Sequence, residues 1–420
     1  MIADMHRVRH LAWELPKLDW ETEVLYPGEQ FQRAEYFEPN AAPLFNPATP
    51  LHQVVPDDPW FFRLLRIRSI GWRAFRPLAA AGAELLKQRR FDLIYISTAN
   101  FPLFCLGRRW AKRFNVPYVL DYHDPWVRDR INYSTTNHKF KVWLMAKISR
   151  WMESYAISGA AGVVSVSPVY IENLRRRYGQ LHCLRPGLSE NIPFAAREQD
   201  LLKADSSSET RREEDREIVY VGAGGAIMAK SFTAICSALA ELRETEPSLL
   251  KRLKIRLFGT YAYWKSGDPK PLQDIAVGFG LGDVVEEFPA RISHRKAMQL
   301  IRRCHGVLIL GVDDPGYVPS KLFMYALSGK PLLASFRADA PSVRVFTEKT
   351  NLGHLLTFKE GTLSSPDAVP IVRQFIREVR DRRRFDRSSE IADYLAPAMA
   401  RRHVKLFERV CSEQSKSWPL

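Results

Sequence analysis

Short apolar runs alternate with helix-like patterns along most of the chain. Short runs bounded by turn residues are typical of buried strands, whereas the stretches between them repeat apolar residues at helical spacing. Because each parallel strand needs a crossover helix, this alternation predicts an α/β protein with doubly wound parallel sheets. The expected strands are Glu23–Tyr26, Leu93–Ser97, Tyr118–Asp121, Val163–Ser167, Ile218–Val221, Ile255–Phe258, Val307–Leu310 and Leu332–Ser335.

Four helices are marked by their ends or by their apolar faces. The first is Ala3–Leu15, and a second follows the strand Val163–Ser167 until Gly179, a residue favoured just past a helix end. The last thirty residues have the pattern of an amphipathic terminal helix. One face of another helix is marked by Phe232, Ile235, Cys236, Leu239 and Leu242.

The length of 420 residues favours two domains over one. Between His182 and Arg216 the regular pattern breaks, and turn residues with dense charge predict a linker with a solvated insertion. We therefore expect a first lobe at 1–185, a linker at 186–216, a second lobe at 217–390 and a terminal helix at 391–420.

The beginning of the sequence is unusual for a doubly wound lobe. Such a lobe normally opens with a strand and a Gly-rich turn, whereas here the helix Ala3–Leu15 comes first. Either the true start lies upstream of Met1, or the lobe has lost a central strand. We expect the first explanation, which reading the DNA upstream of Met1 would test.

The net charge indicates which kinds of partner the protein can bind, and the cysteine content indicates its cellular compartment. The net charge of +15 favours polyanions, which include nucleic acid, an anionic membrane and phosphorylated ligands. The five scattered cysteines form no C-x-x-C pair, so neither a disulfide framework nor a zinc site is indicated. Neither a signal peptide nor a membrane span is apparent in the sequence. We expect a cytoplasmic protein that is soluble or rests on a membrane surface.

The strongest local motif is YVPSKLFMYALSGKPLLA, Tyr317–Ala334. Ser320 is expected to cap a short helix that Gly329 ends, which would leave free N–H groups facing the preceding loop. Lys321 adds a positive charge in the first turn, so the motif predicts an anion site. The alternative is a capped core helix without a ligand.

Two further motifs follow predicted strands. In YVGAGGAIMAKSF, the glycines Gly222, Gly224 and Gly225 would let the backbone approach a phosphate, with Lys230 as a counter-charge; alternatively this is an ordinary turn. In VLDYHDPW, Asp121, His123 and Asp124 would project from a strand end toward a ligand. The alternative is that the carboxylates cap a loop and His123 packs beside Trp126.

In this order, these elements resemble the family 4 glycosyltransferases over most of the chain. The matching pieces are RHLAWELPKLDWETEVLYP, DLIYIS, PYVLDYHDPW, GVVSVSP, YVG…K and VPSKLFMYALSGKPLLA. The resemblance implies a GT-B fold, in which two Rossmann-like lobes face a cleft. It also implies an acceptor-binding N-lobe, a nucleotide-sugar-binding C-lobe and a terminal helix that returns to the N-lobe. Transfer would proceed with retention of anomeric configuration, without an essential metal or a cofactor beyond the nucleotide-sugar co-substrate.

The resemblance also implies roles for particular residues. His123 would lie near the transferred sugar, and the expected catalytic group is His123 with Asp121 and Asp124. Arg291 falls in the loop that borders the base. The expected donor-binding residues are Gly222, Gly224, Gly225, Lys230, Arg291, Asp313, Asp314, Gly316, Tyr317, Ser320 and Lys321.

Two positions depart from the family pattern. The family commonly has two glutamates eight residues apart, and here Gly316 and Met324 stand at those positions. The second glutamate usually holds the ribose, so we expect Asp313 and Asp314 to substitute. The same loss supports a second hypothesis, a catalytically silent GT-B protein that acts as a scaffold.

Two basic stretches interleave arginine or lysine with aromatic residues, at 60–77 and 138–151. Basic amphipathic helices of this type bind anionic lipid, but their apolar faces can equally pack on a sheet. We expect membrane contact for 60–77, and for 138–151 packing is at least as well supported. No nucleic-acid module is readable, so we expect no nucleic-acid partner.

Overall fold

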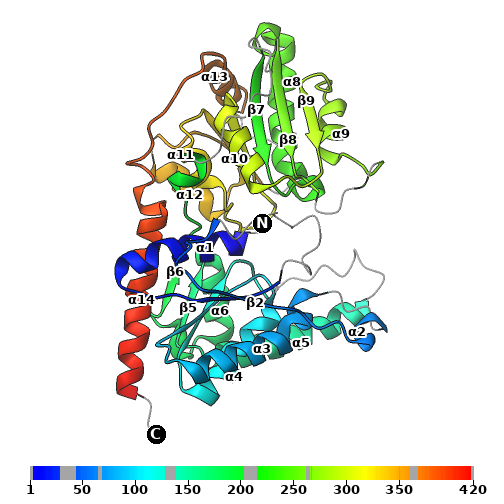
Figure 1. Ribbon diagram of the computed structural model, residues 1–420. Helices are drawn as coiled ribbons and strands as arrows, with labels where there is room; N and C mark the ends of the chain where they lie inside the picture. The colour runs from blue at the N-terminus through cyan, green and yellow to red at the C-terminus, as the bar shows by residue number, and fades with distance from the viewer. Residues whose placement is uncertain are drawn as a thin grey trace. The chain divides into compact units, whose positions relative to one another are not determined.

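The computed structural model describes residues 3–28, 44–64, 69–127, 139–202, 215–261, 265, 267–349, 351–359 and 368–417. The chain divides into two compact units, drawn in Figure 1. The N-terminal unit combines Ile2–Pro193 with Pro397–Leu420, and the C-terminal unit is Phe194–Ala396. The terminal segment therefore lies with the first part of the chain, and each unit is described below by itself.

The N-terminal unit contains two parallel sheets. A four-stranded sheet has the order β3-β4-β5-β6, and a separate pair is formed by β1 and β2. The predicted strands in this unit are present within one or two residues at most ends, and β2 and β6 are additional. The strands are β1 (Val24–Pro27), β2 (Leu51–Val54), β3 (Ile94–Ser97), β4 (Tyr118–Tyr122), β5 (Gly162–Ser165) and β6 (Ser189–Asn191).

One helix layer covers both of these sheets. The helices α3 (Ile70–Gln88) and α4 (Phe104–Phe114) form a buried cluster against which Leu25 of β1 and Ile94 of β3 both pack. In the doubly wound order 3-2-1-4-5-6, β2 and β1 correspond to strands 3 and 2, and β3 corresponds to strand 4. Among the described strands none occupies the position of strand 1, so the sheet is interrupted between β1 and β3.

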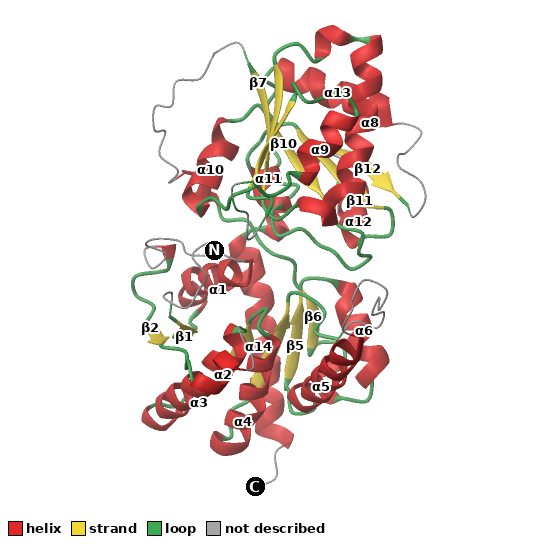
Figure 2. Ribbon diagram, turned by 90° about the vertical axis from the view of Figure 1, so that its right-hand side faces the viewer, coloured by secondary structure: helices red, strands yellow, loops and turns green. Residues whose placement is uncertain are grey.

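The remaining helices of this unit include α1 (Ala3–Glu14) and α14 (Ala396–Ser417), which come from opposite ends of the sequence. The others are α2 (Trp60–Leu64), α5 (Lys139–Ile157) and α6 (Pro168–Tyr178). Figure 2 shows α14 running along the unit that holds β5 and β6. Phe407 of α14 contacts the rings of Tyr95 and Trp20, with ring centroids 5.4 and 5.5 Å away. The predicted terminal helix is thus a core element of the N-terminal unit.

The C-terminal unit is built on one six-stranded parallel sheet with the order β12-β11-β10-β7-β8-β9. This is the order 3-2-1-4-5-6 of dinucleotide-binding folds, with β7 as the first strand and β10 as the fourth. The expected α/β architecture with Rossmann-like lobes is confirmed. The strands are β7 (Arg216–Val221), β8 (Leu253–Phe258), β9 (Val285–Phe288), β10 (Gly306–Leu310), β11 (Leu332–Arg337) and β12 (His354–Phe358).

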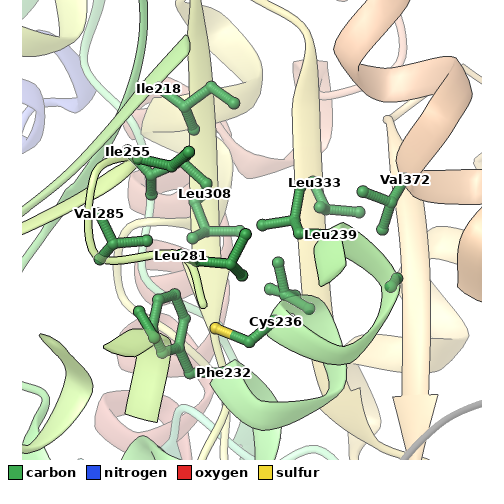
Figure 3. Close-up of a cluster of buried hydrophobic side chains, with 14 of the residues drawn as sticks. Ile218, Phe232, Cys236, Leu239, Ile255, Leu281, Val285, Leu308, Leu333 and Val372 are labelled. Atoms are coloured by element: carbon green, nitrogen blue, oxygen red, sulfur yellow. The ribbon is translucent and has the colours of Figure 1, made fainter. Parts of the chain in front are cut away.

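Helices cover both faces of this sheet. The helices are α8 (Ala229–Thr245), α9 (Pro271–Gly278), α10 (His294–Arg303), α11 (Leu322–Leu327), α12 (Pro341–Glu348) and α13 (Ala368–Arg380). Figure 3 shows Phe232, Cys236 and Leu239 of α8 facing apolar side chains of the strands, as the helical spacing predicts.

The helix Gly225–Thr245 is long and apolar enough, by length and composition, to cross a membrane, and no other helix among the described residues is. The stretch contains Lys230 and Glu241, so it is not the uncharged apolar run that sequence analysis looked for. More than half of the stretch is buried, and its apolar side chains belong to the core in Figure 3. Core packing accounts for its composition.

The segment expected to be a linker, His182–Arg216, also contains regular structure. It includes β6 and the short helix α7 (Glu198–Leu202), while residues 203–214 lie outside the described part. The strand was missed because its sequence, SEN, has no apolar residue.

Candidate functional site

In the C-terminal unit, the predicted donor-binding residues gather at the carboxyl ends of the strands. The order of the sheet reverses between β7 and β10, and ligands of such sheets bind at this point. The turn after β7 contains Gly222 with φ +138° and Gly225 with φ +76°, conformations that side chains disfavour. The Gly224 N–H donates to the Thr260 carbonyl at 2.9 Å, which holds this turn against the end of β8.

Lys321 lies directly against the glycine turn. A Cβ atom added to Gly222 would lie 1.5 Å from the Lys321 Nζ, so only glycine leaves room for this ammonium group. The Nζ also lies 4.8 Å from the centroid of the Tyr220 ring. No acidic side chain of the described residues forms an ion pair with Lys321, which leaves the charge available to an anionic ligand.

Burial lowers the pKa of Lys321 from its usual value to about 7, and the nearby Arg291 guanidinium lowers it further in the same direction. Arg291 follows β9, and its Cα is near Gly259 at the end of β8. The loop that was predicted to border the base therefore lies at the same strand-end edge of the sheet as Gly222 and Lys321.

The helix in the strongest sequence motif begins later than predicted. Its first residue is Leu322, and Lys321 occupies the N-cap position, so the prediction that Ser320 caps this helix is wrong. Because the helix has only six residues, its N-terminus is a weak anion site. The prediction of an anion site here therefore rests on the charge of Lys321. Gly329, with φ +68°, ends the helix as predicted.

Met324 is buried in the apolar cluster beneath α11. The hydroxyl of Tyr325, one residue on, accepts a hydrogen bond from the Val221 N–H at 2.9 Å and so ties α11 to the end of β7. The position at which the resemblance would place a ribose-holding glutamate is therefore occupied by a buried apolar side chain.

Lys230 and Asp313 form an ion pair that sequence analysis did not predict. The Lys230 Nζ lies 2.5 Å from the Asp313 carboxylate, and Arg337 at the end of β11 lies 2.8 Å from its other oxygen. The hydrogen bond from Lys230 is the main cause of the lowered pKa of Asp313. Asp313 was expected to hold a ribose, but its oxygens are engaged by these two cations. The position of Arg337 at a strand end was the only sequence signal for it.

The loop after β10 contains the other predicted residues. The Asp314 carboxylate accepts a hydrogen bond from the Gly316 N–H at 2.7 Å, which closes a tight local turn. Tyr317 follows, and its carbonyl accepts a hydrogen bond from Ser342. These residues share the strand-end edge of the sheet with Gly222, but Asp314 is used within its own loop.

In the N-terminal unit, Asp121 and His123 belong to a buried polar network. The His123 Nε2 lies 2.5 Å from the Asp121 Oδ2, which also accepts hydrogen bonds from Tyr95 at 2.7 Å and Ser97 at 2.9 Å. Arg7 of α1, itself fully buried, lies 3.1 Å from the same oxygen. Burial alone would raise the pKa of Asp121, but the charge of Arg7 and the hydrogen bonds from His123 and Tyr95 outweigh it and hold that pKa well below its usual range.

This network fixes the orientation of the His123 ring. Because the carboxylate only accepts, the His123 Nε2 carries hydrogen, and Nδ1 is the ring nitrogen that can accept a proton. Asp121 therefore orients His123, as a carboxylate orients the histidine of a catalytic triad. Asp124 is exposed, outside this buried cluster.

The network continues to the C-terminal helix. The Tyr95 hydroxyl lies 3.2 Å from the His403 Nε2, and the His403 Nδ1 lies 2.8 Å from the Met399 carbonyl. Burial and the charge of Arg7 lower the pKa of His403 to about 3, so this ring is neutral near pH 7. Sequence analysis missed Arg7, Tyr95 and His403, since nothing in their local patterns links them to Asp121.

Comparisons with known proteins concern the family and the fold of the chain. Residues 6–188 match the family model described as Glycosyltransferase Family 4, which confirms the resemblance to these enzymes. No curated protein sequence matches the chain.

Several solved structures are similar. The Anabaena protein HepE in complex with UDP is 14% identical, with 93% of this chain and 100% of that chain covered and a TM-score of 0.56. A UDP-forming trehalose-phosphate synthase from Burkholderia xenovorans is 13% identical, with coverages of 82% and 79% and a TM-score of 0.52. The N-terminal domain of trehalose-6-phosphate phosphatase from Candida albicans is 12% identical, with coverages of 99% and 93% and a TM-score of 0.57. At such identities the similarity shows the fold, and the expected GT-B fold is confirmed.

Proposed function

We propose that this chain, which matches Glycosyltransferase Family 4 over residues 6–188 and has the GT-B fold, transfers a sugar from a nucleotide-sugar donor to a glycan or lipid-linked acceptor. The observation that carries the proposal is the position of Lys321. Its ammonium group lies against Gly222 at the sheet's switch point, without an acidic partner among the described residues. A diphosphate would supply the missing negative charge.

We assign the stabilisation of the leaving diphosphate to three cations, Lys321, Lys230 and Arg337. As the sugar–phosphate bond breaks, negative charge develops on the diphosphate, and a fixed cation near it lowers the barrier. Lys321 would bind the diphosphate from the floor of the site, and Lys230 and Arg337 would contact it from the more exposed side. With these cations in place, the reaction would proceed without a metal.

In the N-terminal unit, His123 would contact the transferred sugar. The Asp121 carboxylate holds Nε2–H, so Nδ1 is the atom that would accept a hydrogen bond or a proton from a sugar hydroxyl. Retention of the anomeric configuration is part of the proposal, and the anomer of the product, determined by NMR, tests it. The five free cysteines support a reducing, cytoplasmic location.

The direct test is calorimetry of nucleoside-diphosphate binding. UDP is the first ligand to try, because the similar HepE structures contain UDP, or UDP and glucose. Lys321→Met should weaken UDP binding by roughly tenfold to a hundredfold, since a charge-assisted contact contributes about 1.5–3 kcal/mol. Lys251→Met, at an exposed lysine of the same unit, is the matched control. Equal affinity of the Lys321 variant and the wild type would contradict the assignment.

A second candidate, a silent GT-B scaffold, is favoured by Met324 and by the absence of strand 1 among the described strands of the N-terminal unit. Because Met324 is buried and apolar, no carboxylate holds the ribose from this position. Thermal denaturation with a panel of nucleoside diphosphates separates the two candidates. A glycosyltransferase should be stabilised by its own nucleotide, whereas a scaffold needs no stabilisation by any of them.

A further inference from the structure

Helix α5 of the N-terminal unit exposes large apolar side chains along its length. Phe140 is 74% exposed, Trp143 is 47% exposed and Trp151 is 71% exposed. Leu144 and Met145 are also exposed. Aromatic side chains of this size are normally buried, so an exposed row of them marks a surface that contacts another partner. We call Phe140, Trp143, Leu144, Lys147 and Trp151 the α5 stripe.

The α5 stripe has helical spacing, so its members project from one side of the helix. Positions 140, 143, 144, 147 and 151 are separated by three or four residues and so stack along one face. The rings of Phe140 and Trp143 are stacked with centroids 5.8 Å apart. The opposite side of the second half of α5 packs into the core through Met152, Ala156 and Ile157. The core-packing side of α5 is therefore already buried, and the exposed row is a different side of the helix.

Positive charge accompanies the stripe. The sequence KFKVWLMAKISRWM, residues 139–152, contains four basic residues and no acidic one. The Lys147 Nζ lies 5.8 Å from the centroid of the Trp143 ring, and Arg150 is exposed beside Trp151. Alternating cations and aromatic rings fit an interface that has both anionic headgroups and an apolar interior.

The other basic stretch, 60–77, is less suited to this role. Beyond the short helix α2, its described part lies in α3, where Gly71 and Ala74 are buried, and Trp72 and Phe75 pack against the core. In α2, Trp60 and Leu64 are strongly exposed, and residues 65–68 lie outside the described part of the chain. The structure thus favours 138–151 over 60–77 as the membrane-contacting stretch, the reverse of the expectation from sequence.

We propose that the α5 stripe docks this protein on the surface of a membrane that contains anionic lipid. Phe140, Trp143, Leu144 and Trp151 would enter the headgroup region, while Lys147 and Arg150 pair with lipid phosphates. A protein surface is a weaker match, because a folded partner would need a groove that is both acidic and wide enough for three large rings. The proposal is independent of the sugar-transfer assignment.

The experiment is sedimentation of the full chain with vesicles of phosphatidylcholine alone or mixed with phosphatidylglycerol. The wild type should bind the mixed vesicles, bind the neutral ones much less, and dissociate as salt is raised. Trp143→Ser with Trp151→Ser should lower the partition coefficient at least about tenfold. Lys147→Gln with Arg150→Gln should lower binding to mixed vesicles by roughly fivefold per charge.

The matched control is Val277→Ser with Leu202→Ser, which removes two exposed apolar side chains from the C-terminal unit. Thermal denaturation of each variant confirms that the fold is retained. Vesicle binding by the Trp143/Trp151 variant as strong as that of the wild type would overturn the proposal, as would failure of the wild type to bind mixed vesicles. Analytical ultracentrifugation tests self-association. If the wild type is a dimer and the Trp143/Trp151 variant is a monomer, the α5 stripe is a dimer interface and the membrane proposal is wrong.

Discussion

Lys321 is the residue whose chemistry depends most on its surroundings. In the folded protein, burial keeps its pKa at about 7, well below that of an exposed lysine. Between these two values the unfolded chain binds more protons than the folded one, so this residue makes folding less favourable, and its destabilising effect diminishes as pH rises from 7 toward 10. The site therefore holds a charge at a cost to stability.

Diphosphate binding should be accompanied by proton uptake at Lys321 above pH 7. The ligand's negative charge favours the ammonium form, so a lysine that is neutral at pH 8 in the free protein becomes protonated in the complex. Calorimetry with UDP at pH 8, in two buffers with different ionisation enthalpies, measures this uptake. The Lys321→Met variant should show none, and identical binding enthalpies for the wild type in both buffers would contradict the prediction.

The N-terminal network shows how far single residues can be predicted. Asp121 and His123 are close in sequence and follow a strand, so their proximity to one another was predictable. Arg7 and His403 complete the network from the two ends of the chain, and only tertiary packing brings them to Asp121. A buried arginine in a helix pattern looks like a solvated one until its partner is known.

At the scale of elements, the turn after β7 contains two glycines that are required for different reasons. Gly222 and Gly225 both have positive φ, but only at Gly222 would a Cβ collide with Lys321. The nearest atoms to a Cβ at Gly225 are 3.7 Å away, an ordinary contact. The two positions therefore separate backbone strain from displacement of the lysine.

Gly222→Ala should weaken UDP binding about as much as Lys321→Met does, because the new methyl group displaces the Lys321 ammonium. Gly225→Ala should cost about 1–2 kcal/mol of folding free energy through strain alone and should retain binding. Urea unfolding and calorimetry of both variants provide the comparison. If the two variants bind UDP equally well, the contact between Gly222 and Lys321 is irrelevant to the ligand.

Four strands were not predicted. Polar residues make up at least half of the sequence in β2, β6 and β9, and only β12, HLLTF, is mainly apolar. β9 has the sequence VEEF, and its Glu287 is buried because its carboxylate accepts hydrogen bonds from the Leu272 and Gln273 N–H groups at the start of α9. Such a satisfied carboxylate interrupts the apolar pattern by which strands are recognised. The error at Ser320 has a similar origin, since a serine before an apolar run resembles a cap wherever the helix begins.

At the scale of the whole molecule, the N-terminal unit is discontinuous in sequence. Residues 397–420 belong to it although the entire C-terminal unit intervenes. Leu406, Phe407 and Val410 of α14 are buried in it. The unit can therefore complete its core only after the whole chain has been synthesised.

Phe407→Ala should destabilise the N-terminal unit by about 3–5 kcal/mol, the usual cost of such a cavity. Lys405→Ala, at an exposed position on the same helix, should change stability by less than about 0.5 kcal/mol. Thermal and urea denaturation of the two variants measure the difference. Comparable stability of the two variants would show that α14 is dispensable for this core.

The interruption between β1 and β3 has a consequence for the edges of the sheets. Ile94 of β3 donates its N–H to β4, so the peptide groups of Tyr95 and Ser97 point toward the other side of that strand. No described strand pairs with that side, and the described sheets of the N-terminal unit therefore have four edges where an uninterrupted sheet would have two. A free edge is a template for an added strand, and natural proteins protect such edges by covering them; here α1 contacts β3, and His403 and Phe407 of α14 contact the Tyr95 ring.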